Sequence, residues 1–233
     1  MKERIGGTGT GVYAKGGDVT LEKVEIKGVE TGVYAEKGIF KMDGGSVTEF
    51  TDYGVSVGSA VKSASLARVT ITGQGGIGSY GVYAEGKEGM TLKLDDVKIS
   101  RVQTGVYAEK GIFKMDGGSV TKFTGYGVSV GDKVTSASLA RVTIEGKGSE
   151  DSYGVYAVGA ESLMMTLDDV RISNVAMGVS VEKAKSLMMT GGSVTDFADY
   201  GVDVGENVKS AELKGVEIEG KNSGTGTGVY AKV

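Results

Sequence analysis

Two pairs of adjacent carboxylates are the residues of this 233-residue chain whose types and spacing most resemble catalytic chemistry. Asp95-Asp96 and Asp168-Asp169 could act as acid and base on a glycosidic bond, or hold calcium. Each pair, however, directly precedes a Val-x-Ile segment, where a tight turn is expected and Asp tolerates the required backbone angles. No segment gathers a cluster of Asp, Arg and Lys that its sister segments lack. We therefore interpret both pairs as turn residues and expect no enzyme activity.

The absence of two residue types narrows the chemistry further. The chain contains no histidine and no cysteine. Serine-histidine and cysteine-histidine catalysis are excluded, as is a disulfide framework, and the commonest metal ligand is missing. We expect no catalytic residues, no metal and no cofactor.

Three glycine-rich segments superficially resemble phosphate-binding loops: GQGGIGS at Gly73, GKGSEDS at Gly146 and GKNSGTG at Gly220. None follows a strand and opens a helix with a lysine and a serine placed for phosphate. Loops on one face of a repeat protein often display recognition residues, whereas glycine-rich insertions are often only flexible bulges. Both interpretations stay open at this point. The residues that would serve recognition here are Gln74, Ile77, Lys147, Glu150, Asp151, Lys221 and Asn222.

A series of tyrosines follows a recurring Gly-Val pair. Stacked above one another, they would form a stripe that binds a receptor or a glycan, or else a surface ladder that protects a sheet. The members of this series are Tyr13, Tyr34, Tyr83, Tyr107, Tyr156 and Tyr230. Other tyrosines precede the glycine, and we interpret them as a packing choice for turns of different length: Tyr53, Tyr80, Tyr126, Tyr153 and Tyr200.

Charge and hydropathy exclude two further classes of partner. The chain has 26 basic and 30 acidic residues, a net charge of -4, and no strongly basic block, so nucleic acid is not expected to bind. No run approaches the roughly 20 apolar residues that span a bilayer, so we expect no membrane insertion. The segment MKERIGGTGT lacks the apolar core of a signal peptide.

Internal repeats organise the whole chain. A Gly-Val-x-(Ala/Val) motif recurs at intervals of 21 to 27 residues, which is typical of a solenoid. It begins at Gly11, Gly32, Gly54, Gly81, Gly105, Gly127, Gly154, Gly178, Gly201 and Gly228. A longer period of 73 residues is superimposed, because TGVYAEKGIFKMDGGSVT at Thr31 recurs unchanged at Thr104. We divide the chain into units 31–103 and 104–176, a degenerate partial unit 177–233, and a partial unit 1–30.

Between these motifs, apolar residues alternate as in a strand. Val24 and Ile26, or Val97 and Ile99, are two residues apart, whereas a helix would return at three and four. The sequence therefore predicts an all-β, right-handed, single-stranded parallel β-helix of about nine to ten coils, roughly 45 Å long at the usual strand spacing. The valines of the Gly-Val pairs should form one inward column and the residues two positions later its neighbour. The glycine before each valine is expected to permit a bend.

The two ends of the chain share a phrase. GGTGTGVYAK at Gly6 is nearly repeated by SGTGTGVYAK at Ser223, and neither end shows an atypical capping coil. Exposed solenoid ends offer unpaired strand edges. We expect an excerpt from a longer protein, or a protein that associates with itself end to end.

The order of GVYAEKG, GGSVTEFTDYGVSVG and SASLARVTITG resembles the passenger domains of Bartonella autotransporters, including the secreted angiogenic factor group. The likeness covers nearly the whole chain. It implies a β-helical passenger, secreted or displayed on the bacterial surface after transport by a C-terminal β-barrel. The resemblance to the angiogenic members implies that the chain acts as a mitogen on a vascular endothelial growth factor receptor. The partner would then be a receptor on host endothelium.

Three functions compete at this stage. The first is a non-enzymatic, pro-angiogenic effector that engages the endothelial receptor. The second is a passive adhesin or structural passenger that binds matrix or glycans. The third, a polysaccharide lyase or hydrolase, would need catalytic machinery for which the sequence offers only the carboxylate pairs.

Overall fold

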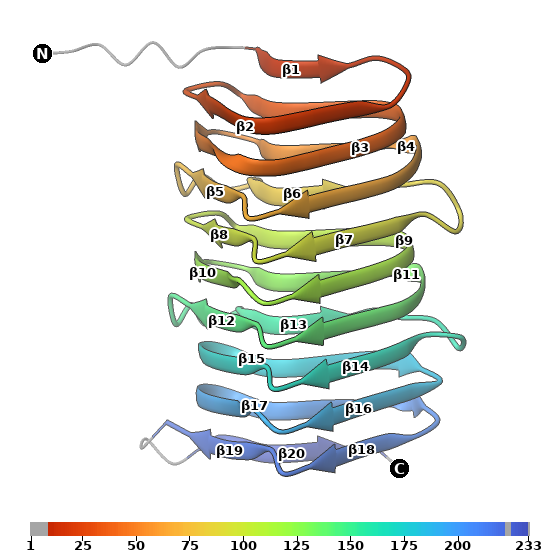
Figure 1. Cartoon of the computed structure of the whole chain (residues 1–233). Helices are drawn as coiled ribbons and strands as arrows, with labels where there is room; N and C mark the ends of the chain where they lie inside the picture. The colour runs from red at the N-terminus through yellow and green to blue at the C-terminus, as the bar shows by residue number, and fades with distance from the viewer. Residues whose placement is uncertain (1–8, 222–224, 233) are drawn as a thin grey trace, which may run out of the picture.

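The computed structural model describes residues 9–221 and 225–232. These residues form twenty β-strands and no helix, and all strands belong to one continuous sheet. Every neighbouring pair of strands is parallel, for example β3 with β4 and β15 with β17. The sheet winds into a right-handed parallel β-helix of about nine turns (Figure 1), which confirms the predicted fold class. The described residues include no helix that is long and apolar enough to cross a membrane.

Each coil of the rod presents three faces in turn. The first, which we call the tyrosine face, contains four whole strands: β1 (Thr10–Ala14), β6 (Tyr80–Ala84), β13 (Tyr153–Ala157) and β20 (Thr227–Ala231). It also contains the first residues of four longer strands: β3 (Thr31–Phe50), β4 (Tyr53–Ala67), β9 (Thr104–Asp116) and β11 (Tyr126–Ala140). The later residues of β15 (Arg171–Ala184) and β17 (Ser193–Val208) complete it. The second face contains β7 (Thr91–Asp95), β14 (Met164–Asp168), β16 (Ser186–Thr190) and β18 (Ala211–Lys214). The third face contains β5 (Thr70–Gly73), β8 (Lys98–Ser100), β10 (Ser119–Phe123), β12 (Thr143–Gly146) and β19 (Glu217–Gly220), and β2 (Val19–Lys27) follows both the second and third faces.

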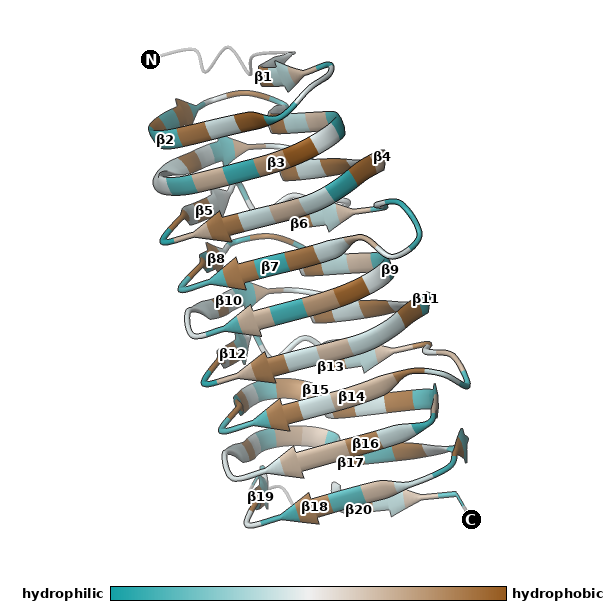
Figure 2. Cartoon of the chain, turned by 45° about the vertical axis from the view of Figure 1, so that its right-hand side comes forward, coloured by the Kyte–Doolittle hydropathy of each residue, from teal (hydrophilic) through white to brown (hydrophobic). Residues whose placement is uncertain are grey.

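The predicted inward columns are confirmed along the middle of the rod. Val33 pairs with Val55, which pairs with Val82, and none of the three is exposed. Because a strand turns alternate residues to opposite sides, such columns repeat as hydrophobic bands along each strand (Figure 2). The column is less well covered at its ends, where Val12 is partly buried and Val229 is 47% exposed.

Aromatic residues divide sharply between inside and outside. All five phenylalanines of the chain are buried in the core: Phe40, Phe50, Phe113, Phe123 and Phe197. All eleven tyrosines, by contrast, lie on strands of the tyrosine face, and none is fully buried. The phenolic hydroxyl explains the division, since a buried one would need a hydrogen-bond partner in an otherwise apolar interior.

The turn between the second and third faces has a left-handed residue at one shared position in each coil, and in three coils the next residue, Gly45, Gly118 or Gly192, is left-handed too. Asp96 and Asp169 occupy this position with φ of 49°. The same place in other coils is taken by Lys23, Gly44, Arg68, Gly117, Arg141, Gly191 and Gly215. Short polar side chains and glycine tolerate this conformation best, so the interpretation of the Asp pairs as turn residues is confirmed.

The glycine before each inward valine has a different role from the one expected. Gly105 does not have positive φ, so the prediction of a special bend is wrong. Instead, a Cβ on Gly105 would lie 2.4 Å from the carbonyl oxygen of Gly127 in the next coil and 2.2 Å from the Val120 side chain. The glycine is therefore required by close packing, because the backbones of successive coils and an inward side chain meet at this point.

We expect Gly105→Ala to lower the free energy of unfolding by about 1–3 kcal/mol, because the added methyl group must displace backbone atoms. Gly76→Ala is the matched control, since a Cβ there meets no atom within 4 Å. Urea denaturation followed by far-UV circular dichroism measures both variants. Equal unfolding midpoints would show that close packing is not what the glycine column provides.

Candidate binding surface

The tyrosine face displays two outward columns on every strand. In β6, Tyr80 and Tyr83 both emerge partly exposed, although they are three residues apart, because Gly81 and Val82 are both buried between them. The glycine thus breaks the alternation of a regular strand by one residue and places both side chains on the same side. One column contains the residues that precede the glycine, and the other contains those that follow the valine.

The tyrosines of the two columns pack against one another as predicted for a ladder, but in clusters. The ring centroids of Tyr83 and Tyr107 are 5.3 Å apart and the rings are stacked. Tyr80 lies edge-on to Tyr83, at 5.2 Å, and stacks on Tyr53 at 5.6 Å. These separations fall in the range in which aromatic pairs attract each other. A continuous aromatic surface therefore covers three coils at this level.

One further cluster and two pairs follow the same pattern. Tyr126, Tyr153 and Tyr156 form the second cluster, with centroids between 5.1 and 5.4 Å apart. Tyr200 and Tyr230 form a third contact, at 5.3 Å. Tyr13 and Tyr34 pair near the N-terminal end, at 5.2 Å.

The structure brings together more tyrosines than the sequence analysis assigned to the stripe. The six predicted members all lie in the column after the valine. The tyrosines that precede the glycine, interpreted from the sequence as turn packing alone, also join the clusters. The phrase Tyr-Gly-Val-Tyr at Tyr80 and Tyr153 contained the signal, because a glycine inside a strand often marks a break in its alternation.

Carboxylates surround these rings. The ten five-residue segments that start one residue before the Gly-Val pair, such as 80–84 and 177–181, contain no lysine or arginine. The Tyr13 hydroxyl donates a hydrogen bond to Glu36 over 2.8 Å, and the Tyr156 hydroxyl donates one to Glu182. Burial, followed by the charges of Glu85 and Glu109, raises the pKa of Tyr83 to about 12. The Tyr13 and Tyr156 hydroxyls therefore act as hydrogen-bond donors rather than as bases.

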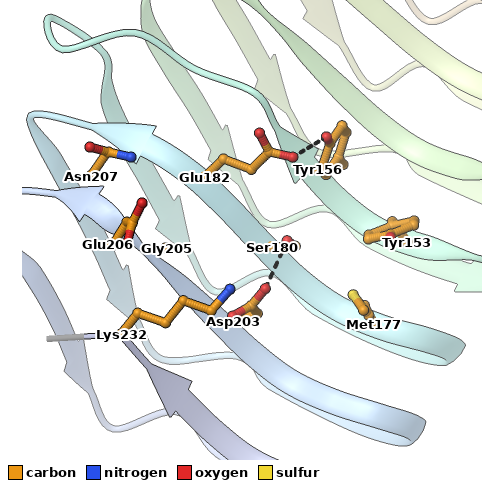
Figure 3. A pocket seen from close by; sticks show the side chains of 10 residues that line it. All are labelled: Tyr153, Tyr156, Met177, Ser180, Glu182, Asp203, Gly205, Glu206, Asn207 and Lys232. Carbon is orange, nitrogen blue, oxygen red and sulfur yellow. Dashed lines mark hydrogen bonds between the residues drawn. The ribbon is translucent and has the colours of Figure 1, made fainter.

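A hollow in this face lies where the tyrosine column is interrupted. It has a volume of about 620 Å³, and we call it the Ser180 hollow (Figure 3). Tyr153 and Tyr156 form one wall, and Ser180 and Asp203 lie between this wall and Lys232. In the three coils after Tyr156, the residues that pair in register at its position are Ser180, Asp203 and Tyr230. Two coils therefore lack the outward tyrosine.

Acceptor groups dominate the Ser180 hollow. Glu182 and Glu206 line it together with Asp203. One Asp203 oxygen lies 3.4 Å from the Ser180 hydroxyl. The other is buried and has no hydrogen-bond partner among the described residues. The hollow is therefore both aromatic and acidic, with carboxylate oxygens available to a ligand that donates hydrogen bonds.

A smaller hollow of about 270 Å³ lies over Ser56. Here a single coil lacks the outward tyrosine, between Tyr34 and Tyr83. Tyr53 and Glu85 also line it. Ser129 occupies the equivalent position between Tyr107 and Tyr156 in the second unit.

The glycine-rich loops lie on one side of the rod, at an edge of the tyrosine face. Those after β5 and β12 protrude on the left of Figure 1. The loop residues of the recognition prediction that the structure describes are Gln74, Ile77, Lys147, Glu150, Asp151 and Lys221, whereas Asn222 lies outside the described residues. Ile77 is 96% exposed, and the Gln74 side chain donates to the Glu49 carbonyl. These loops therefore border the tyrosine clusters, and the structure does not bring Ile77 into them.

Two of these loops are anchored in the same way. Ser79 and Ser152 are completely buried. Each donates to a carbonyl three residues earlier over 2.6 Å and accepts a backbone hydrogen bond from the next coil over 3.1 Å. The loops are thus held at their bases, a feature that the glycine content of the sequence does not reveal.

The carboxylate pairs lie apart from the hollows. Asp95 is 3.5 Å from Lys93 and Asp169 is 3.0 Å from Arg171, and all four side chains are well exposed. In the described part of the chain, no group of three or more Asp or Glu side chains is arranged to hold a metal ion. The pairs therefore take part in surface ion pairs at the turns.

Comparison with models of protein families, with curated proteins and with solved structures finds no match for this chain.

We expect the folded protein to titrate its tyrosines in more than one step, because burial and carboxylates raise the pKa of Tyr83, Tyr107 and Tyr156 above the ordinary value of 10.0. The unfolded chain ionises first as the pH rises, so this stabilisation is complete below about pH 10 and is lost as the pH rises through the folded pKa values. Absorbance at 295 nm measures the ionisation, and Tyr83→Phe should remove part of the late step. A single step near pH 10 in the native protein would contradict the clustered arrangement.

Proposed function

We propose that this chain is a non-enzymatic binding protein that contacts its partner through the tyrosine face. The observation that supports this is the placement of all eleven tyrosines on one face, while all five phenylalanines are buried. Packing alone would not restrict hydroxyl-bearing rings to one of three solvent-exposed faces. Tyrosine offers a partner a large, rigid contact area and a hydrogen-bond donor at low entropic cost.

The charge around the rings favours a basic partner surface. The carboxylates that raise the pKa values of Tyr83, Tyr107 and Tyr156 include Glu85, Glu109 and Glu182. Glu109 pairs with Lys110, whereas no salt bridge joins Glu85 or Glu182 to a basic side chain among the described residues. Complementary charge would speed the encounter and select among partners.

The partner that we propose is a receptor on host endothelium, of the vascular endothelial growth factor class, with the chain acting as a secreted or surface-displayed pro-angiogenic passenger. This proposal is supported by the resemblance to Bartonella autotransporter passengers in the phrases GVYAEKG and SASLARVTITG. Tyr83 and Tyr156, equivalent members of two clusters, are three coils apart, or roughly 14 Å. That spacing is smaller than a folded domain, so activation by two receptor copies would require two rods.

We expect Tyr80→Ser, Tyr83→Ser and Tyr107→Ser combined to weaken binding to endothelial cells roughly tenfold or more, because clustered aromatic side chains dominate the energetics of protein interfaces. Serine already occupies the column of Tyr83 and Tyr107 at Ser56 and Ser129, and the small hydroxyl residue Thr104 occupies the column of Tyr80, so the fold should tolerate the changes. The matched control combines Thr70→Ala, Lys98→Ala and Thr143→Ala on exposed positions of the third face. Binding is measured by flow cytometry with the labelled chain, beside receptor phosphorylation.

Each result distinguishes the competing functions. Receptor phosphorylation that the tyrosine variant loses and the control retains would support the effector. Attachment to cells or matrix without phosphorylation would favour the adhesin. Equal binding by the two variants would contradict the role of the tyrosine face, and release of reducing or unsaturated sugars from polysaccharides would indicate an enzyme.

A further inference from the structure

The internal repeat is broken at the positions that form the Ser180 hollow. In the first two units, the residue after the inward valine is Tyr34 or Tyr107, and its equivalent in the third unit is Ser180. Ser56 and Ser129 are likewise replaced by Asp203. The supporting residues Glu36 and Glu109, however, recur as Glu182, and Gly58 and Gly131 recur as Gly205. The third unit thus keeps its scaffold and changes its outward side chains.

The consequence is a larger and more acidic opening than in the sister units. The opening over Ser56 lies between tyrosines of neighbouring coils and has a volume of about 270 Å³, whereas the Ser180 hollow reaches about 620 Å³. Removing one tyrosine widens the gap by a coil, and Asp203 adds a carboxylate where the sister coils have serine.

These carboxylates have no basic partner within the described chain. No salt bridge joins Glu182, Asp203 or Glu206 to a lysine or arginine among the described residues. Nearby Lys183 and Lys209 pair with Glu161 instead. Lys232 lies over the Tyr230 ring, 5.7 Å from its centroid. Lys232 is nevertheless the one basic residue among those that line the hollow, so the three carboxylates leave it with a net negative charge.

Two kinds of contact in the hollow suit one chemical group. A guanidinium is planar, stacks on aromatic rings and donates several hydrogen bonds in a fixed fork. Tyr153 and Tyr156 offer the rings, while Asp203 and Glu182 offer carboxylates at two places in the lining. A neutral sugar could stack on the same rings, but it would leave the carboxylates without a counter-charge as it displaced their water.

We propose that the Ser180 hollow is a binding site for an arginine side chain of a partner protein. The guanidinium lies against the Tyr153 and Tyr156 rings and donates hydrogen bonds to Asp203 and Glu182. This site deepens the proposed role of the tyrosine face by naming the side chain that it recognises. It also assigns the third unit a specificity that the first two units lack.

The experiment titrates the isotopically labelled full chain with the blocked tripeptide acetyl-Gly-Arg-Gly-amide and follows backbone amide shifts by NMR. The comparison ligand contains citrulline, which has nearly the shape of arginine but no charge. We expect the arginine peptide to shift the amides of Ser180, Glu182 and Gly205 and to bind on the order of tenfold more tightly than the citrulline peptide. Raising the salt concentration should weaken the binding of the arginine peptide and leave that of the citrulline peptide unchanged.

Variants that restore the repeat test the site itself. Ser180→Tyr fills the hollow with the side chain that Tyr107 contributes in the sister unit and leaves every carboxylate in place. It should reduce binding at least tenfold. Ser56→Tyr makes the same change in the smaller hollow and should have no effect. Asp203→Ser restores the sister serine, so it provides a second loss-of-binding variant that the fold should accept.

Several results would overturn the proposal. Equal affinity for the citrulline peptide would show that charge is not recognised, and unchanged binding by both Ser180→Tyr and Asp203→Ser would place the peptide elsewhere. Binding of neutral chitotetraose in place of the peptide, lost in Ser180→Tyr, would identify a glycan site. Because no cell or receptor is used, failure here leaves the test of the tyrosine face by cell binding intact.

Discussion

The structure depends on the hydrogen bonding of each coil onto the next in parallel register. Because strands stack at one fixed spacing, each residue lies between two others of the same structural position. At the glycine column this constraint leaves no room for a side chain, since a Cβ on Gly32, Gly105 or Gly178 would lie 2.4 Å from the carbonyl oxygen of the next coil. The glycine of the repeated Gly-Val pair therefore allows successive coils to approach closely enough to form the parallel hydrogen bonds between them. Inward valines and outward tyrosines are consequences of the same strand geometry.

The interior and the exterior of the rod obey this constraint differently. Inside, a change of side-chain volume in one coil must be matched by its neighbours, so Phe50, Phe123 and Phe197 recur in equivalent places. Outside, a side chain can change without disturbing the coil below it. Ser180 and Asp203 illustrate this freedom, because their inward neighbours Val179 and Val204 remain buried like those of the sister coils. Divergence between repeats therefore accumulates on the surface, where binding specificity is also determined.

Much of the fold followed from the sequence because its signals are local. The spacing of Val97 and Ile99 indicated a strand, and the position of Asp96 before them indicated the turn that the structure contains. The role of Gly105 was misassigned because its neighbours in space, Val120 and Gly127, are 15 and 22 residues away in the sequence. The Ser180 hollow was missed for a related reason. It arises because two successive coils lack the tyrosine in one column, and such an absence becomes visible only when the register of the coils is known.

The tyrosine clusters link stability to binding. Where the ladder is continuous, as from Tyr80 to Tyr107, part of the surface of each ring is already in contact with a neighbouring ring. Where it is interrupted, the ring of Tyr156 borders the hollow, and Asp203 retains an oxygen without a partner. A partner side chain gains the most binding energy at such an interruption. There it can make the contacts with Tyr156 that the outward tyrosine of the next coil makes where the ladder is continuous. The coil that departs most from the repeat is thus the one in which the rod stabilises itself least and can bind a partner most selectively.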